Sequence, residues 1–265
     1  MIPYSVHDAA DNMAIDEAIL DAHLDGSVTP TLRLYGWQPR AVSIGYGQKL
    51  SNTIESRMKS RGYDVVRRPT GGRAVLHEFE LTYSFVGSAG GADDFGGALS
   101  DSVIGAYKQI CQGLILAFKE LGVELELGES SSNYKNAQDC FLATTSADLH
   151  YQGKKMIGSA QLRRKSAVLQ HGSILLNQPQ DLMNRLLKEG ESTQGESSNP
   201  EIQRHANLFE ILGEPVSIPR LQEVMKLGFE SAFSNQYDIE NLKDHELELA
   251  QQYRPRYQVA CSKTS

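Results

Sequence analysis

The chain has 265 residues, of which 40% are hydrophobic and 22% charged, so it can bury the core of one large α/β domain or two small ones. A formal net charge of −7 argues against a general nucleic-acid-binding protein and against a membrane-surface protein. No apolar run approaches a membrane span, and residues 1–5 do not resemble a secretion signal, so we expect a cytoplasmic or organelle-stromal location.

Hydrophobic periodicity and turn residues divide the chain into short elements. A helix is expected over 11–24 with Asp11 as its N-cap, and another over 101–121 with Cys111 on its buried face. A third is expected over 217–233, with the packed residues Leu221, Val224, Met225, Leu227 and Phe229. Shorter helices are expected at 52–61, 181–188 and 246–253, followed by a frayed tail from Arg254. Strands are expected at 31–35, 41–44, 63–66, 79–86, 123–127 and 167–176, with a hairpin over 148–161.

The cysteines do not indicate a disulfide or a structural metal. Cys111, Cys140 and Cys261 are odd in number and have no CxxC spacing, and no HExxH or Walker-type motif is present. The sequence therefore predicts no metal site. Cys140 falls in a polar loop, where it is a surface thiol, a loop anchor or a reactive group.

The most informative stretch reads Arg67-Arg68-Pro69-Thr70-Gly71-Gly72-Arg73-Ala74-Val75-Leu76-His77-Glu78, called the signature stretch below. Its glycine pair allows positive φ and a close approach to a ligand, and its amides can bind a carboxylate, a phosphate or an oxyanion. The arginines add donors that stay charged at any working pH. The plain alternative is a tight hairpin with solvated arginines.

This stretch resembles the signature of the biotin/lipoate protein ligase and octanoyltransferase superfamily. Arg73 after the glycine pair resembles the cysteine-dependent octanoyltransferase branch rather than the ATP-using lipoate ligases, and Glu78 replaces the usual aspartate. Two further segments are similar to family motifs, namely Gly153-Lys154-Lys155-Met156-Ile157-Gly158-Ser159-Ala160-Gln161 and Gln170-His171-Gly172-Ser173. Cys140-Phe141 stands where the octanoyltransferase branch has a Cys-Phe pair before the lysine.

The resemblance implies an α/β (α+β) fold, a mixed sheet flanked by helices like that of biotin ligases and class II aminoacyl-tRNA synthetase cores. It implies a single catalytic domain over 1–255 with a flexible tail over 256–265. Cys140 would be the nucleophile, and Lys155, otherwise an exposed strand lysine, would lower the pKa of Cys140 and hold the acyl carbonyl. The residues expected to bind substrate are Tyr46, Gln48, Arg68, Thr70, Gly71, Gly72, Arg73, His77, Gly158, Ser159, Ala160, His171 and Gly172. For both histidines a hydrogen-bonded structural role stays open.

The implied reaction transfers an octanoyl group from octanoyl-acyl carrier protein to a lysine of a lipoyl domain, in the glycine cleavage H protein or a 2-oxoacid dehydrogenase E2. It passes through a cysteine thioester and needs no cofactor, because the donor is already activated. The alternatives are an ATP-dependent lipoate ligase, an amidotransferase between lipoyl domains, and a catalytically silent carrier-binding protein. A basic landing site for acidic partner domains is expected at Arg67, Arg68, Arg163, Arg164 and Lys165, unless these are ordinary solvated charges.

Overall fold

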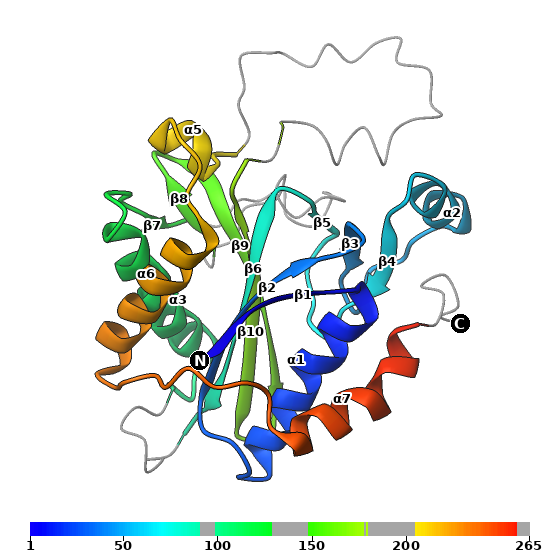
Figure 1. Ribbon diagram of the computed structural model, residues 1–265, viewed down its shortest axis with the longest axis horizontal. Helices are drawn as coiled ribbons and strands as arrows, with labels where there is room; N and C mark the ends of the chain where they lie inside the picture. The colour runs from blue at the N-terminus through cyan, green and yellow to red at the C-terminus, as the bar shows by residue number, and fades with distance from the viewer. Residues whose placement is uncertain (91–98, 129–147, 178, 180–204, 259–265) are drawn as a thin grey trace.

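The computed structural model describes residues 1–90, 99–128, 148–177, 179 and 205–258. Within these residues the strands form a seven-stranded sheet of order β1-β2-β6-β10-β9-β8-β7 and a three-stranded sheet of order β4-β3-β5 (Figure 1). The strands are β1 Ile2–His7, β2 Thr31–Trp37, β3 Ala41–Ile44, β4 Asp64–Arg67, β5 Val75–His77, β6 Glu80–Ser88, β7 Glu126–Leu127, β8 Leu149–Tyr151, β9 Lys154–Arg164 and β10 Ala167–Leu175. The helices are α1 Ala9–Leu24, α2 Asn52–Ser60, α3 Val103–Lys119, α5 Leu208–Leu212, α6 Ile218–Phe233 and α7 Asp244–Tyr257. None of these helices is long and apolar enough to cross a membrane.

Helices cover both faces of the larger sheet, with α1 and α7 on one side and α3 and α6 on the other (Figure 1). Phe85, Phe118 and Phe229 belong to the apolar cluster of the α3–α6 layer, which also buries Cys111 as predicted. Ile19 and Tyr253 belong to the cluster between the sheet, α1 and α7. The predicted mixed sheet flanked by helices is confirmed.

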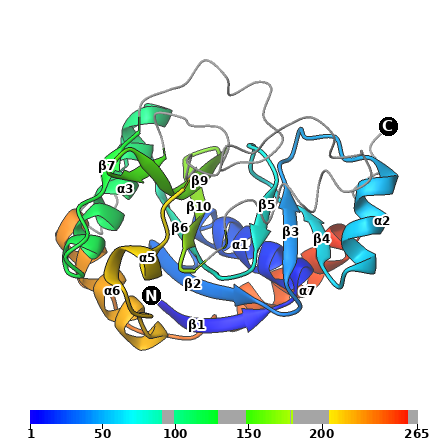
Figure 2. The same cartoon turned by 90° about the horizontal axis from the view of Figure 1, so that it is seen from above.

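The smaller sheet lies beside the larger one, with α2 on its outer side (Figure 2). β3 pairs in parallel with β4 and antiparallel with β5, so it lies between the two strands that the signature stretch joins. The plain hairpin that was the alternative for this stretch is therefore wrong. Gly45, directly after β3, packs so closely on the stretch that a Cβ there would lie 2.0 Å from the Gly72 carbonyl oxygen. Gly72 itself has a φ of +94°, which a side chain would strain.

The ends of several predicted elements differ from the structure. The side chain of Asp8 accepts a hydrogen bond from the Asp11 N–H at 2.8 Å, so Asp8 rather than Asp11 is the N-cap of α1. Of the expected strand at 123–127, β7 retains two residues. Neither β1 nor α5 was predicted. The helix expected at 181–188 lies outside the described residues.

The C-terminal part of the chain is more ordered than the sequence indicates. Helix α7 continues to Tyr257, and the Arg254 guanidinium pairs with Asp8 and Asp11 on α1. The frayed tail expected from Arg254 is therefore wrong as far as Tyr257. In α6, Leu227 is 44% exposed and does not belong to the packed face predicted for it.

Candidate active site

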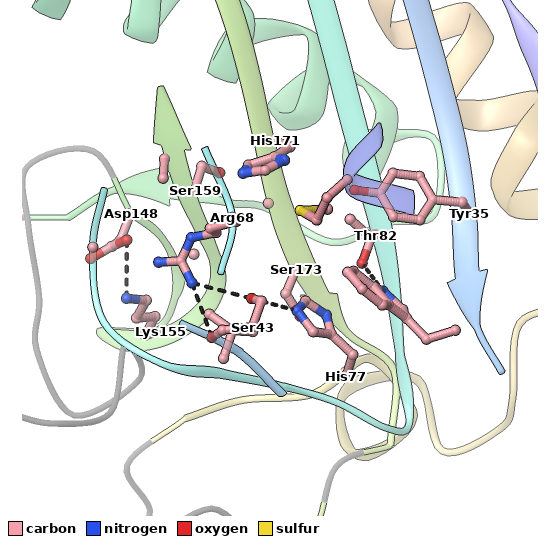
Figure 3. A pocket seen from close by; sticks show the side chains of 17 residues that line it. Tyr35, Ser43, Arg68, His77, Thr82, Asp148, Lys155, Ser159, His171 and Ser173 are labelled. Atoms are coloured by element: carbon pink, nitrogen blue, oxygen red, sulfur yellow. Dashed lines mark hydrogen bonds and ion pairs between the residues drawn. The ribbon is translucent and has the colours of Figure 1, made fainter. Parts of the chain in front are cut away.

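A cavity lies between the two sheets, and residues from both line it (Figure 3). Side chains of Met13, Tyr35, Trp37 and Val75 give it apolar surface. Its polar lining residues are Ser43, Arg68, His77, Thr82, Asp148, Lys155, Ser159, His171 and Ser173. The backbone lines the cavity at Gly72, Gly158 and Gly172. The mixed lining suits a ligand that has an apolar part and a reactive polar group.

Arg68 holds the signature stretch in shape. It is 5% exposed, and its guanidinium donates to the carbonyl oxygens of Gly71 and Arg73, both at 2.7 Å. It also donates to the backbone carbonyl and the hydroxyl of Ser43 on β3, each at 3.2 Å. The guanidinium thus fixes the turn, and it stays charged at any working pH.

A first buried chain of hydrogen bonds runs from Asp16 to this stretch. His171 donates from Nδ1 to the Asp16 carboxylate at 2.9 Å, and its Nε2 lies 2.6 Å from the Thr70 hydroxyl. Asp16 also accepts from Arg33, Tyr35 and Ser84. Burial would raise the pKa of Asp16, but the bond from His171 and the charge of Arg33 outweigh it and lower the pKa. The carboxylate therefore stays ionised and can orient His171.

A second chain runs from Glu80 on β6. His77 donates from Nδ1 to Glu80 at 3.2 Å, while its Nε2 lies 2.8 Å from the Ser43 hydroxyl that Arg68 also contacts. Burial lowers the pKa of His77 despite the partner carboxylate, so the ring is neutral near pH 7 and its Nε2 accepts from Ser43. Trp37 stacks on this ring with centroids 3.9 Å apart, which fixes its plane.

The Lys155 ammonium lies 3.0 Å from the Asp148 carboxylate, and both side chains are 2% exposed. The alternative of an exposed strand lysine is therefore wrong. β9 starts at Lys154 after a two-residue turn in which Gln152 and Gly153 both have positive φ, which confirms the predicted hairpin. The strand thus places a buried ammonium at the cavity, and a charge with little solvent contact acts strongly on a reacting group.

The structure brings together most of the residues predicted to bind substrate. Those that line the cavity are Arg68, Gly72, His77, Gly158, Ser159, Ala160, His171 and Gly172, together with Lys155. Thr70 lies behind His171, whereas Gly71, Arg73, Tyr46 and Gln48 do not line the cavity, and Tyr46 is 71% exposed. Cys140 lies outside the described residues. No metal-binding group of His, Cys, Asp or Glu occurs in the described part of the chain.

Several residues of the site were not expected, among them Asp16, Trp37, Ser43, Glu80 and Asp148. The sequence did contain a signal for Asp16, because it is a carboxylate among the apolar residues of a helix. If that helix is buried, such a carboxylate needs hydrogen-bonding or charged partners. Asp148 gave no signal of its own, because its partner Lys155 becomes a neighbour only when the hairpin turns back.

The basic residues expected to form a landing site are largely used inside the protein. Arg67 donates to the carbonyls of Gly45, Tyr46 and Gln48, and Arg163 donates to those of residues 100–102. Arg164 pairs with Glu17 and Asp21. Arg68 is buried and cannot contact a partner domain, whereas the landing site expected at the other four residues stays a prediction.

Comparison with known proteins identifies the family. The model described as lipoyl protein ligase A/B catalytic domain matches residues 8–230. The chain is 37% identical to octanoyltransferase LipM of Kyrpidia tusciae, over 94% of this chain and 92% of that protein. It is 38% identical to octanoyltransferase LipM of Carboxydothermus hydrogenoformans, over 92% and 89%. The T. acidophilum protein Ta0514, described as a lipoate protein ligase, shares the fold with a TM-score of 0.74 and 23% identity, over 97% of this chain and 95% of that one.

The chain therefore belongs to the lipoyl protein ligase A/B catalytic-domain family, as its signature stretch predicted. Its similarity to octanoyltransferases over nearly the whole length makes it an acyltransferase.

Proposed function

We propose that the protein transfers an octanoyl group from octanoyl-acyl carrier protein to a lysine of a lipoyl domain, in protein lipoylation. The choice of octanoyl as the acyl group is supported by the similarity of the chain to octanoyltransferases. The observation that carries the proposal is the buried Lys155–Asp148 pair, in one cavity with the signature stretch. The acceptors would be the glycine cleavage H protein or a 2-oxoacid dehydrogenase E2.

Met13, Tyr35, Trp37 and Val75 supply a surface suited to the acyl chain. Burial of each methylene stabilises the complex by about 0.8 kcal/mol, so an octanoyl chain gains several kcal/mol. The thioester carbonyl would then lie at the polar end, near Lys155.

The proposed nucleophile is Cys140. Its thiolate attacks the thioester carbonyl, and the carrier thiolate leaves and takes up a proton. The neutral amine of the acceptor lysine then attacks the acyl-enzyme, the C–N bond forms and the C–S bond breaks, so that Cys140 leaves as the thiolate. The proton that the amine loses goes to solvent and balances the one taken up by the carrier thiolate. Support comes from the ends of the segment that contains Cys140: Gly128 donates to the Asp148 carbonyl at 2.8 Å, so the segment begins and ends beside the partner of Lys155.

Lys155 is proposed to stabilise the oxyanion that forms in both steps. Asp148 balances its charge in the resting protein, and a carbonyl oxygen that becomes negative competes with this carboxylate for the ammonium. The interaction is thus stronger in the transition state than in the ground state, as catalysis requires.

The test is octanoylation of a lipoyl domain by octanoyl-carrier protein without ATP, followed by mass spectrometry. We expect wild type and the neighbouring control Lys154→Met to transfer within about twofold of each other, and Lys155→Met to lose about 100-fold or more, as for removal of an oxyanion donor. Modification only with ATP and free octanoate or lipoate would show a ligase instead. Preference for an octanoylated lipoyl domain as donor would show an amidotransferase.

A further inference from the structure

The positive charge of this acidic protein is concentrated in one segment. Residues 40–73, called the basic lobe below, hold eight arginines and lysines and two acidic residues, a formal charge of +6. Because the whole chain has −7, all other residues together carry −13. The basic residues of the lobe are Arg40, Lys49, Arg57, Lys59, Arg61, Arg67, Arg68 and Arg73.

The basic lobe consists of β3, α2, β4 and the first half of the signature stretch. It stands at one side of the molecule, away from α3 and α6 (Figure 2). Ser43, Arg68 and Gly72 of the lobe line the cavity, so its inner side is one wall of the site. A protein bound to this lobe would therefore be next to the cavity.

The formal charge of +6 already includes Glu55, and the pair of Arg40 with Glu78, which lies outside the lobe, reduces it to +5. Lys59 pairs with Glu55 at 2.7 Å, and Arg40 pairs with Glu78 at 2.9 Å. Arg67 donates to backbone carbonyls, which are neutral and leave its charge intact. Lys49 is exposed, and Arg57 is partly exposed on α2. Arg164, outside the lobe, differs from Arg67, because two carboxylates on α1 balance its charge.

We infer that the basic lobe is the docking surface for the acidic carrier protein that donates the acyl group, an inference that rests on the proposed function. Such a donor presents acidic helices and an acyl arm attached through a phosphodiester, so both parts are attracted to a positive surface. The acceptor presents a lysine side chain and has no such phosphodiester arm. The lobe thus favours the donor and orients it toward the cavity.

The test compares two triple variants that remove the same charge. Lys49→Gln/Arg57→Gln/Lys59→Gln changes the lobe, while the control Lys108→Gln/Lys119→Gln/Lys243→Gln changes three exposed lysines elsewhere. Each is assayed with octanoyl-carrier protein and with octanoyl-N-acetylcysteamine, a small thioester that needs no docking. The small donor also shows that each variant is folded and active.

We expect the lobe variant to raise KM for the carrier protein roughly tenfold at low salt, with a smaller effect at high salt. Its rate with the small thioester, and both rates of the control, should stay within about twofold of wild type. An unchanged KM for the carrier, an equal loss with both donors, or a raised KM for the lipoyl domain instead would overturn the inference. No transfer by wild type from either donor would overturn the proposed function, and the inference with it.

Discussion

At the scale of single residues, two buried carboxylates determine the shape of the site. Asp16 acts on Thr70 through His171, and Glu80 acts on Arg68 through His77 and Ser43. Both chains end on the signature stretch, one at Thr70 and the other at Arg68. A buried polar network of this kind is stable when its members are satisfied, and the loss of one member affects the others.

The Lys155–Asp148 pair allows its roles in folding and in catalysis to be separated. Asp148→Leu leaves a buried ammonium without its counter-charge, which should lower the free energy of unfolding by about 3–5 kcal/mol. Lys155→Met/Asp148→Leu removes both charges and should recover most of that loss, yet remain inactive. Urea denaturation and the transfer assay measure the two effects. A double variant that transfers octanoyl groups would show that the pair is only structural.

His77 should make stability depend on pH. Its ordinary pKa is 6.5 and burial lowers it, so between the two values the unfolded chain binds more protons and acidification destabilises the fold. The slope is at most about 1.4 kcal/mol per pH unit for this residue. His77→Gln should flatten part of the fall in stability below about pH 6.5. The rest of the fall remains, because burial also lowers the pKa of His7 and His150. An unchanged slope would contradict this assignment.

At the scale of elements, the close packing of α3 and α6 supports the outer layer of the large sheet. A Cβ at Gly228 would lie 2.4 Å from the Ala117 nitrogen and 2.5 Å from the Gly113 carbonyl oxygen. The two backbones therefore approach at glycines, and a side chain there must separate the helices.

Gly228→Ala should lower the free energy of unfolding by about 1–3 kcal/mol, the usual effect of overpacking. The control is Leu227→Ala at the preceding, 44% exposed position, which should change it by less than about 1 kcal/mol. Thermal melts of both variants measure this difference. Equal melting temperatures would show that α6 shifts without strain.

The sequence predicted element types better than their ends. The stripe at Leu221, Val224, Met225 and Phe229 located α6 correctly, but periodicity did not reveal that Leu227 lies just beyond the covered face. For α7, apolar residues are sparse, and its stability depends on contacts with α1 such as the bond from Tyr253 to Asp21. Contacts between distant segments leave no local signal in the sequence. The predicted start of the tail, Arg254, was therefore too close to the N-terminus.

At the scale of the whole molecule, the motifs predicted the family, the fold class and the group of residues around Lys155 and His171. They did not predict the carboxylates that orient these residues, because Asp16 meets Arg33, Tyr35, Ser84 and His171 only when three strands assemble on α1. The basic lobe was readable from charge counts alone, but its place on one wall of the cavity requires the fold.

In the proposed reaction the acyl group passes through Cys140. Intact-protein mass spectrometry after incubation with octanoyl-carrier protein, without ATP, tests it directly. Cys140→Ala is compared with Cys111→Ala, because burial raises the pKa of Cys111 to about 12 and keeps that thiol protonated.

We predict a hydroxylamine-labile octanoyl adduct on wild type and on Cys111→Ala, and none on Cys140→Ala. An adduct that persists in Cys140→Ala, or transfer to the lipoyl domain at the wild-type rate by that variant, would contradict the account.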